Sequence, residues 1–267
     1  MKKTALALGS AFMLFANTVD AQEQPWSFGV KAGGSMSWLH GSKKACLAKG
    51  EICDREVDFE YKTSGRLAFA GGLTAGYAFN EKIGVGLEVL YSGLGGKITQ
   101  TKKLSNGATD AEKKANKSTI YRIYTDNIAI PVMFKWFPMG YDPEKGIFTV
   151  DLGVQGTMAL RTKVEQKDES KDNAKFEEMK GTGSKELDKK KIGNPFTLDA
   201  IAGVSYEFPG IGLTLEGRYH FGFMNLLKGG DDAKNYRNET LKMEKDATLR
   251  NHYLTLSLGY NLARLLL

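Results

Sequence analysis

Apolar and polar residues alternate with a period of two along much of this chain. Within 253–262, Leu, Leu, Leu, Tyr and Leu occupy the even positions, whereas Thr, Ser, Gly and Asn follow at odd positions from 255 onward. The same alternation recurs at 148–160, 196–208 and 211–223. Because successive side chains of a β-strand point to opposite faces, these segments predict four strands, each with one apolar and one polar face.

Four further segments are predicted as strands, at residues 26–39, 65–80, 82–101 and 118–138. Short connections near 80–82, 138–145 and 209–210 alternate with long ones at 40–64, 102–117, 165–192 and 228–246. Strict alternation of this kind places all long loops at one rim of a closed sheet and both termini at the other. The predicted fold is all-β: a single eight-stranded, up-and-down, antiparallel transmembrane β-barrel with four long extracellular loops.

A soluble eight-stranded barrel would turn its apolar face inward, whereas a membrane barrel turns it outward. Two features favour the membrane barrel over a soluble periplasmic one. The polar face carries ionisable groups in the middle of strands, and the apolar face carries aromatic residues near both ends of the strands. One predicted girdle contains Trp26, Phe28, Tyr77, Phe79, Trp136, Phe148, Phe208 and Tyr260; the other contains Trp38, Tyr91, Tyr124, Phe196, Phe221 and Tyr253. Two girdles around an aliphatic band suit the two interfaces of a bilayer.

The first residues have the pattern of a secretory signal peptide. Lys2 and Lys3 precede an apolar stretch, and residues 19–21 (Val-Asp-Ala) form a small–x–small cleavage motif. We expect residues 1–21 to be removed by cleavage between Ala21 and Gln22, leaving 22–267 as the barrel domain. An N-terminal anchor helix is the alternative, but the apolar stretch is shorter than the roughly 20 residues that such a helix needs.

Composition and charge narrow the function classes further. The chain holds 31 Gly but only 6 Pro, as suits a tightly curved sheet. Loss of Lys2, Lys3 and Asp20 with the leader would lower the net charge from +6 to +5, a modest excess that does not argue for nucleic acid. No segment after the leader reaches 18 apolar residues without a charge, so no transmembrane helix is expected there.

Three stretches resemble the outer-membrane β-barrel family of Bacteroidetes that is often labelled porin-family. They are Phe28–Ser35, Glu88–Lys97 and Ile128–Trp136, the last with an apolar–Pro–apolar–Lys core. The resemblance implies a bacterial outer-membrane location and insertion by the barrel-assembly machinery. Many such barrels end on an aromatic residue that this machinery reads. Here Gly259–Leu262 resembles that signal, but Ala263–Leu267 run on past it, which leaves the register of the last strand open.

The polar face predicts a charge network inside the barrel. Its candidate members are Lys31, Glu88, Lys135, Asp151, Asp199, Glu216, Arg218 and His220. Eight strands leave an interior just wide enough for side chains, and unpaired charges there would be costly. We therefore expect a mostly closed, salt-bridged lumen. A narrow water-filled path is the alternative, because glycines on the inner face leave space.

Cys46 and Cys53 both lie in the first long loop. The export route is oxidising, so we expect them to form a disulfide; two free thiols are the alternative. With only His40 nearby, no metal site is expected, and no cofactor is implied. The second long loop is net basic through Lys102, Lys103, Lys113, Lys114 and Lys117. Such loops could contact lipopolysaccharide phosphates.

Three functions remain open at this point. The first is a monomeric structural or surface-binding scaffold in contact with outer-membrane lipid and lipopolysaccharide, its surface ligand unknown. The second is a small porin for ions or small solutes. The third is a lipid-modifying enzyme, but no serine is placed beside His220 or His252 as a nucleophile would require. We therefore expect no enzymatic activity.

Overall fold

The structure is a computed structural model that describes residues 25–41, 59–102, 109, 118–169, 175–178, 194–226 and 249–265. The predicted leader and its cleavage site at Ala21–Gln22 lie outside these residues, as do Cys46 and Cys53. Within the described part of the chain, no helix is long and apolar enough to cross a bilayer.

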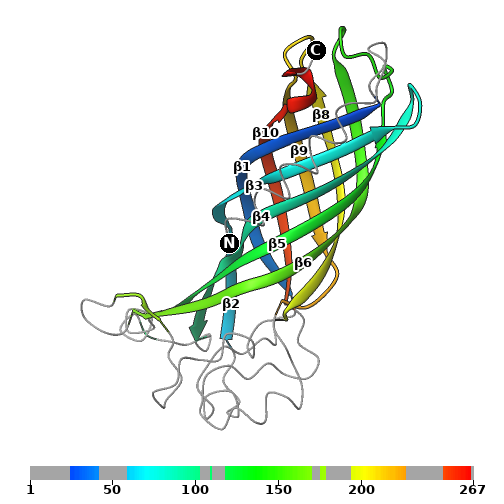
Figure 1. The fold of residues 1–267 in the computed structure, drawn as a ribbon. Helices are drawn as coiled ribbons and strands as arrows, with labels where there is room; N and C mark the ends of the chain where they lie inside the picture. Colours follow the sequence, from blue (N-terminus) through cyan, green and yellow to red (C-terminus); the bar gives the residue numbers. More distant parts are fainter. Residues whose placement is uncertain are drawn as a thin grey trace.

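Eight strands form the barrel wall (Figure 1). They are β1 (Trp26–Gly41), β3 (Arg66–Ala78), β4 (Ile83–Lys102), β5 (Thr119–Trp136), β6 (Ile147–Asp168), β8 (Phe196–Glu207), β9 (Leu213–Gly222) and β10 (Leu249–Asn261). Each strand pairs antiparallel with the next one along the wall, and β1 closes the ring by pairing with β10. The predicted eight-stranded up-and-down barrel is confirmed.

Two short strands lie outside this ring. The first, β2 (Phe59–Ser64), pairs with the end of β4, and the second, β7 (Glu177–Glu178), pairs with the end of β6. Both fall in segments predicted to be loops, and β6 runs to Asp168, well beyond its predicted end near residue 160. A short 3₁₀ helix, η2 (Leu262–Leu265), follows β10 and takes Leu262 out of the last strand, where it had been predicted.

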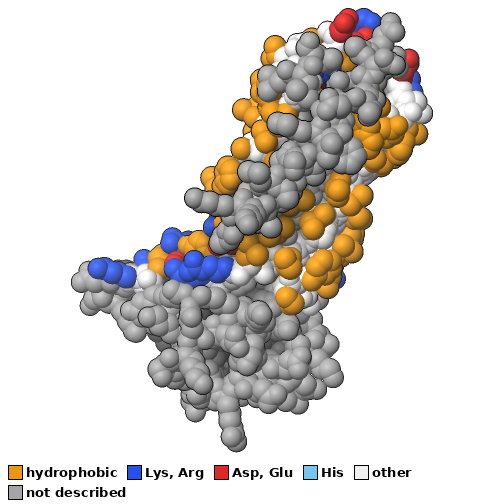
Figure 2. All heavy atoms as spheres, in the orientation of Figure 1, with side chains coloured by type: hydrophobic (Ala, Val, Ile, Leu, Met, Phe, Trp, Pro, Cys, Tyr) orange, Lys and Arg blue, Asp and Glu red, His pale blue; other side chains and the backbone are white. Residues whose placement is uncertain are grey.

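The wall has its apolar side chains outside and its polar side chains inside. Leu73 and Leu256 are 62% and 65% exposed on the outer face, whereas Asp151 and Arg218 are 0% and 2% exposed on the inner face. Figure 2 shows hydrophobic side chains gathered in a band over the barrel. A soluble protein would bury the leucines and expose the charges, so this wall is built to face lipid.

Aromatic side chains gather near both ends of this band, as predicted. At the short-turn end, the ring of Trp26 lies 4.5 Å from that of Tyr77. At the other end, Trp38 lies 6.2 Å from Tyr219. The prediction for Tyr253 was wrong, because this residue is 1% exposed inside the barrel. Its position two residues before Thr255 places it on the inner face by the period of the strand itself.

We expect a folded sample of the protein to migrate differently from a boiled one on an SDS gel. Every strand of the ring is hydrogen bonded on both edges, so no open edge is available from which detergent could unzip the sheet. The boiled sample should run near the mass of the unfolded chain, which is 29.4 kDa for all 267 residues and less once the leader is removed. The unheated sample should run at a different position. Identical migration of the two samples, checked beside one unfolded in urea, would contradict a closed barrel.

Candidate functional site

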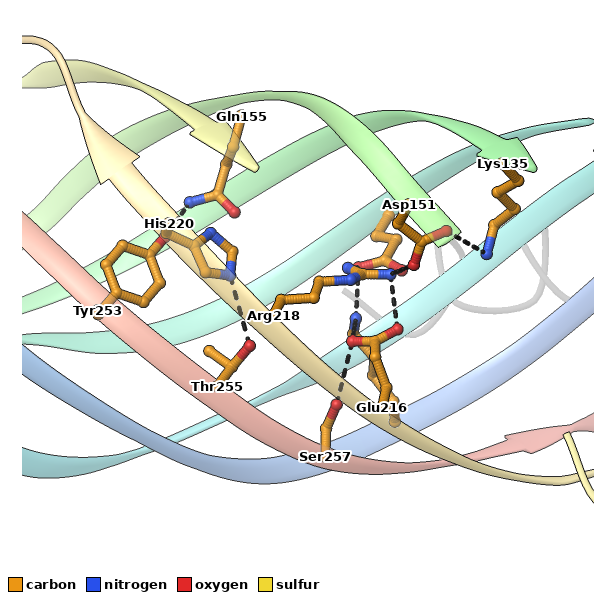
Figure 3. A network of polar contacts seen from close by, with 11 residues as sticks. Lys135, Asp151, Gln155, Glu216, Arg218, His220, Tyr253, Thr255 and Ser257 are labelled. Carbon is orange, nitrogen blue, oxygen red and sulfur yellow. Dashed lines mark hydrogen bonds and ion pairs between the residues drawn. The ribbon is translucent and has the colours of Figure 1, made fainter. Parts of the chain in front are cut away.

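A layer of ion pairs crosses the lumen, with Arg218 of β9 at its centre (Figure 3). The guanidinium donates from Nη1 to Glu88 Oε2 at 2.8 Å and from Nη2 to Glu88 Oε1 at 2.9 Å. The Nη2 atom also lies 2.6 Å from Glu216 Oε2 and 3.2 Å from Asp151 Oδ2. One arginine thus joins carboxylates from β4, β6 and β9, and the two-pronged contact with Glu88 fixes its orientation.

Two lysines complete this layer. The Nζ atom of Lys31 lies 2.7 Å from Glu88 Oε2 and 2.7 Å from Glu216 Oε1. The Nζ atom of Lys135 lies 3.5 Å from Asp151 Oδ1. Three cations therefore face three carboxylates. The layer as a whole is therefore electrically neutral, and each buried carboxylate has at least one cation beside it. Buried charges are tolerated in a protein interior only when they are paired in this way.

Strand register and glycines place these side chains at one level. Arg218 lies opposite Gly203, which in turn lies opposite Asp151. A Cβ atom on Gly203 would stand only 2.5 Å from Cγ of Arg218, and one on Gly86 would stand 2.7 Å from Cε of Lys135. The glycines therefore provide the volume that the long cationic side chains occupy.

Two predicted members of the network lie elsewhere in the lumen. Asp199 accepts hydrogen bonds from Gln155 Nε2 and Thr157 Oγ1, each at 3.2 Å, and pairs with no cation among the described residues. Gln155 also donates to the hydroxyl of Tyr253. His220 stacks on the Tyr253 ring at 4.0 Å. These residues form a second polar cluster, so the prediction of a single charge network was wrong for Asp199 and His220.

The free space in the lumen is unequal along the barrel. A cavity of about 100 Å³, large enough for about three waters, lies on the short-turn side between Lys31, Lys135 and Tyr141. Burial raises the pKa of the Tyr141 phenol, which keeps it neutral. Beyond the ion pairs, a space of only about 20 Å³ lies beside Arg218 and His220.

Four apolar side chains lie buried in the lumen toward the long-loop end. Leu39, Leu94, Ile98 and Ile123 are between 1% and 4% exposed there. The remaining space near Leu94 and Asn251 is about 10 Å³. These four residues were not predicted as part of the site, although the position of Leu39, two residues beyond the inward Ser37, was a signal that it faces inward. Buried polar side chains, among them Ser37, Thr125 and Asn251, lie between these apolar ones, so this end of the lumen is closely packed and of mixed polarity.

Both histidines that were considered for catalysis have partners other than serine. His220 Nε2 lies 3.4 Å from Thr255 Oγ1, and His252 Nδ1 lies 3.0 Å from the Tyr219 hydroxyl. In the described ranges, no three His, Cys, Asp or Glu side chains gather as metal ligands would.

Residues 18–228 match the family described as outer membrane protein beta-barrel domain. The chain belongs to this family. Membership of the outer membrane protein beta-barrel domain family places the protein in the bacterial outer membrane. This location agrees with a wall that has apolar side chains outside and polar side chains inside. A search of the curated proteins finds no match to the chain.

Three solved structures illustrate the likeness to known barrels. Neisserial surface protein A is 12% identical, with 89% of this chain and 99% of that chain covered and a TM-score of 0.39. OprG from Pseudomonas aeruginosa is 13% identical, with 89% and 96% covered and a TM-score of 0.36. The outer membrane protease OmpT from Escherichia coli is 12% identical, with 92% and 99% covered and a TM-score of 0.31. Likenesses this distant transfer no role to this chain.

Proposed function

We propose that this outer-membrane barrel is a closed scaffold that presents charged surfaces at its long-loop end and conducts no solute through its lumen. The ion-pair layer carries this proposal. It joins Arg218 and Lys31 to carboxylates on β4, β6 and β9, and thereby spans the lumen from wall to wall. An open pore would require several of these short contacts to break together, which would leave buried charges unpaired.

The apolar residues beyond this layer support the same proposal. A path for ions would have to pass the level of Leu39, Leu94, Ile98 and Ile123, which are nearly fully buried. The space beside Leu94 is about 10 Å³, close to the least volume that holds a single water. Side chains packed this closely leave an ion no room to keep its hydration shell, which opposes its passage.

The purified full chain should show no discrete conductance steps in a planar lipid bilayer. The same preparation should show the gel shift described above, so that silence reflects a folded barrel and not a denatured one. Reproducible steps from the folded protein would overturn the closed lumen.

A small porin is the second candidate, and the polar cavity of about 100 Å³ on the short-turn side favours it. In that case Lys31 and Glu88 would line the conducting path. Substitutions Lys31→Gln and Glu88→Gln should then shift the ion selectivity of the channel in opposite directions, because they remove charges of opposite sign.

We also propose that the barrel is not an enzyme. The hydrogen bonds of His220 and His252 to Thr255 and Tyr219 support this, because neither partner is the serine that a Ser–His lipid-modifying mechanism requires. Substituting both histidines should leave the lipid A and phospholipid species of the membrane unchanged by mass spectrometry. A product that disappears with the histidines would contradict the proposal.

A further inference from the structure

The outer face of three neighbouring strands changes from apolar to basic at one level. On β5, the outward positions 128, 130, 132, 134 and 136 are Ile, Ile, Val, Phe and Trp, and toward the long-loop end they are followed by Asp126, Tyr124 and Arg122. Strand register aligns this change with its neighbours, because Lys97 of β4 lies opposite Arg122, and Lys163 of β6 lies opposite Tyr124. The change is therefore a property of the surface and not of one strand.

The basic surface beyond this level is called the cationic ledge. Its seven cations are Lys62, Arg66, Lys97, Arg122, Arg161, Lys163 and Lys167. Two carboxylates with described side chains, Asp126 and Glu165, lie on the same face of these strands. The ledge therefore keeps a strong positive excess among its described strand residues.

The ledge extends past the rest of the wall. β4 and β6 contain 20 and 22 residues, whereas β9 contains 10, and β2 widens the projecting sheet by pairing with the end of β4. The sheet bends where it leaves the wall, at Gly95 with φ of 134° and at a register shift between Asp126 and Asn127. Figures 1 and 2 show this extension flaring from the barrel, with Lys and Arg side chains beside the lower end of the hydrophobic band.

Aromatic rings hold two of the cations in place on this face. The Arg66 guanidinium lies 4.4 Å from the centre of the Tyr124 ring, and that of Arg122 lies 3.5 Å from the centre of the Phe176 ring. The Tyr91 hydroxyl donates to Asp126 at 3.0 Å. Tyr91 and Tyr124 thus mark the edge of the lipid-facing band, and the ledge begins at this edge.

We propose that the cationic ledge binds the phosphate groups of phosphorylated glycolipid headgroups, of the lipid A type, in the leaflet around the long-loop end. The inference rests on the proposed function for its orientation, with the long loops on the outer side of the membrane. The nine residues from 128 to 136 span about 27 Å of strand, and a strand tilt of about 40° reduces this to roughly 21 Å along the membrane normal. The ledge therefore lies at the level of the headgroups, where phosphates are dense.

Charge complementarity and continuity with the lipid-facing band favour this occupant over a soluble one. Arg and Lys donate charge-assisted hydrogen bonds to phosphate oxygens, and several such groups on one sheet can contact both phosphates of one lipid. A lipid whose chains already lie against the apolar band loses little further translational and rotational entropy when its headgroup binds the ledge.

Native mass spectrometry of the full chain in a non-ionic detergent tests the proposal, with bis-phosphorylated lipid A as the probe. The ledge variant Lys97→Gln/Arg122→Gln should bind this lipid at least roughly tenfold more weakly than the parent protein. The matched control Lys82→Gln/Lys145→Gln removes two exposed cations at the short-turn rim and should bind it as the parent does. The charge-retaining variant Lys97→Arg/Arg122→Lys should keep most of the binding, which separates lost charge from lost folding.

Three results would overturn the proposal. The first is unchanged lipid A binding by a ledge variant that shows the normal gel shift. The second is equally tight binding of dephosphorylated lipid A. The third is equally tight binding of phosphatidylglycerol, because that result would mean that the ledge binds any anionic lipid. Conductance reports on the lumen separately. A silent barrel with an inert ledge would leave the closed lumen standing, and a conducting barrel with an active ledge would overturn the closed lumen alone.

Discussion

Replacing Arg218 by methionine should destabilise the folded barrel by about 3–5 kcal/mol, the usual cost of breaking a buried ion pair from one side. Methionine fills much of the same volume but leaves Asp151 without one of its two cations, and leaves Glu88 and Glu216 to share Lys31. The midpoint of the heat-dependent gel shift and urea unfolding in detergent would both report the loss. Arg161→Met removes the same side chain from an exposed position and should change stability by no more than about 0.5 kcal/mol.

A second substitution distinguishes a lost charge from a lost ion pair. Glu88→Gln in the Arg218→Met background removes the carboxylate that made two hydrogen bonds to the guanidinium. The double variant should therefore recover part of the stability, giving a coupling energy of roughly 1–3 kcal/mol. Strictly additive effects of the two changes would mean that the two groups are not coupled in the folded barrel.

Gly203→Val should destabilise the barrel by roughly 1–3 kcal/mol through overpacking, and by more if Arg218 is displaced from its carboxylates. A Cβ at this position would stand 2.5 Å from Arg218 Cγ and 2.8 Å from the carbonyl oxygen of Gly217, and the backbone oxygen cannot move aside easily. Valine otherwise favours strands, so a loss of stability would reflect the missing space and not the strand propensity.

Gly217→Val is the matched control for this prediction. Gly217 is on the neighbouring strand and faces outward, and a Cβ there would meet no atom within 4 Å. We expect this variant to be neutral or more stable by about 0.5–1 kcal/mol, because an apolar residue with high strand propensity replaces glycine on the lipid-facing wall. Equal loss from both variants would show that the inner glycine provides no special space for Arg218.

The period-two pattern was sufficient to identify the eight strands of the ring and which way most of their side chains point. The pattern works because lipid and lumen impose opposite polarity on alternate residues, as at Leu254 and Ser257 of β10. It fails where both faces meet polar surroundings. Beyond Arg161 the residues of β6 no longer alternate in polarity, so the strand was predicted to end early, and β2 was predicted to be loop for the same reason.

Height along the barrel axis is the quantity that the pattern does not contain. Asp199 and Gly203 share the inner face of β8, but they are four positions apart, which is about 13 Å of strand. Gly203 lies opposite Arg218, whereas Asp199 lies near Gln155 and Thr157. Face alone therefore predicted one network for residues that strand register separates into two.

The pairing of β1 with β10 also determines how the molecule can be assembled. This seam joins thirteen residue pairs between the first and last strands of the ring, from Gly29–Asn261 to Gly41–Leu249. Until β10 arrives, both edges of the sheet carry unpaired backbone groups, and hydrocarbon would penalise each of them by several kcal/mol. Insertion of the sheet into the hydrocarbon should then be nearly all-or-none. A sheet that lacks its final strand leaves the backbone N–H and C=O groups of both edges without hydrogen-bond partners, however many strands it already has.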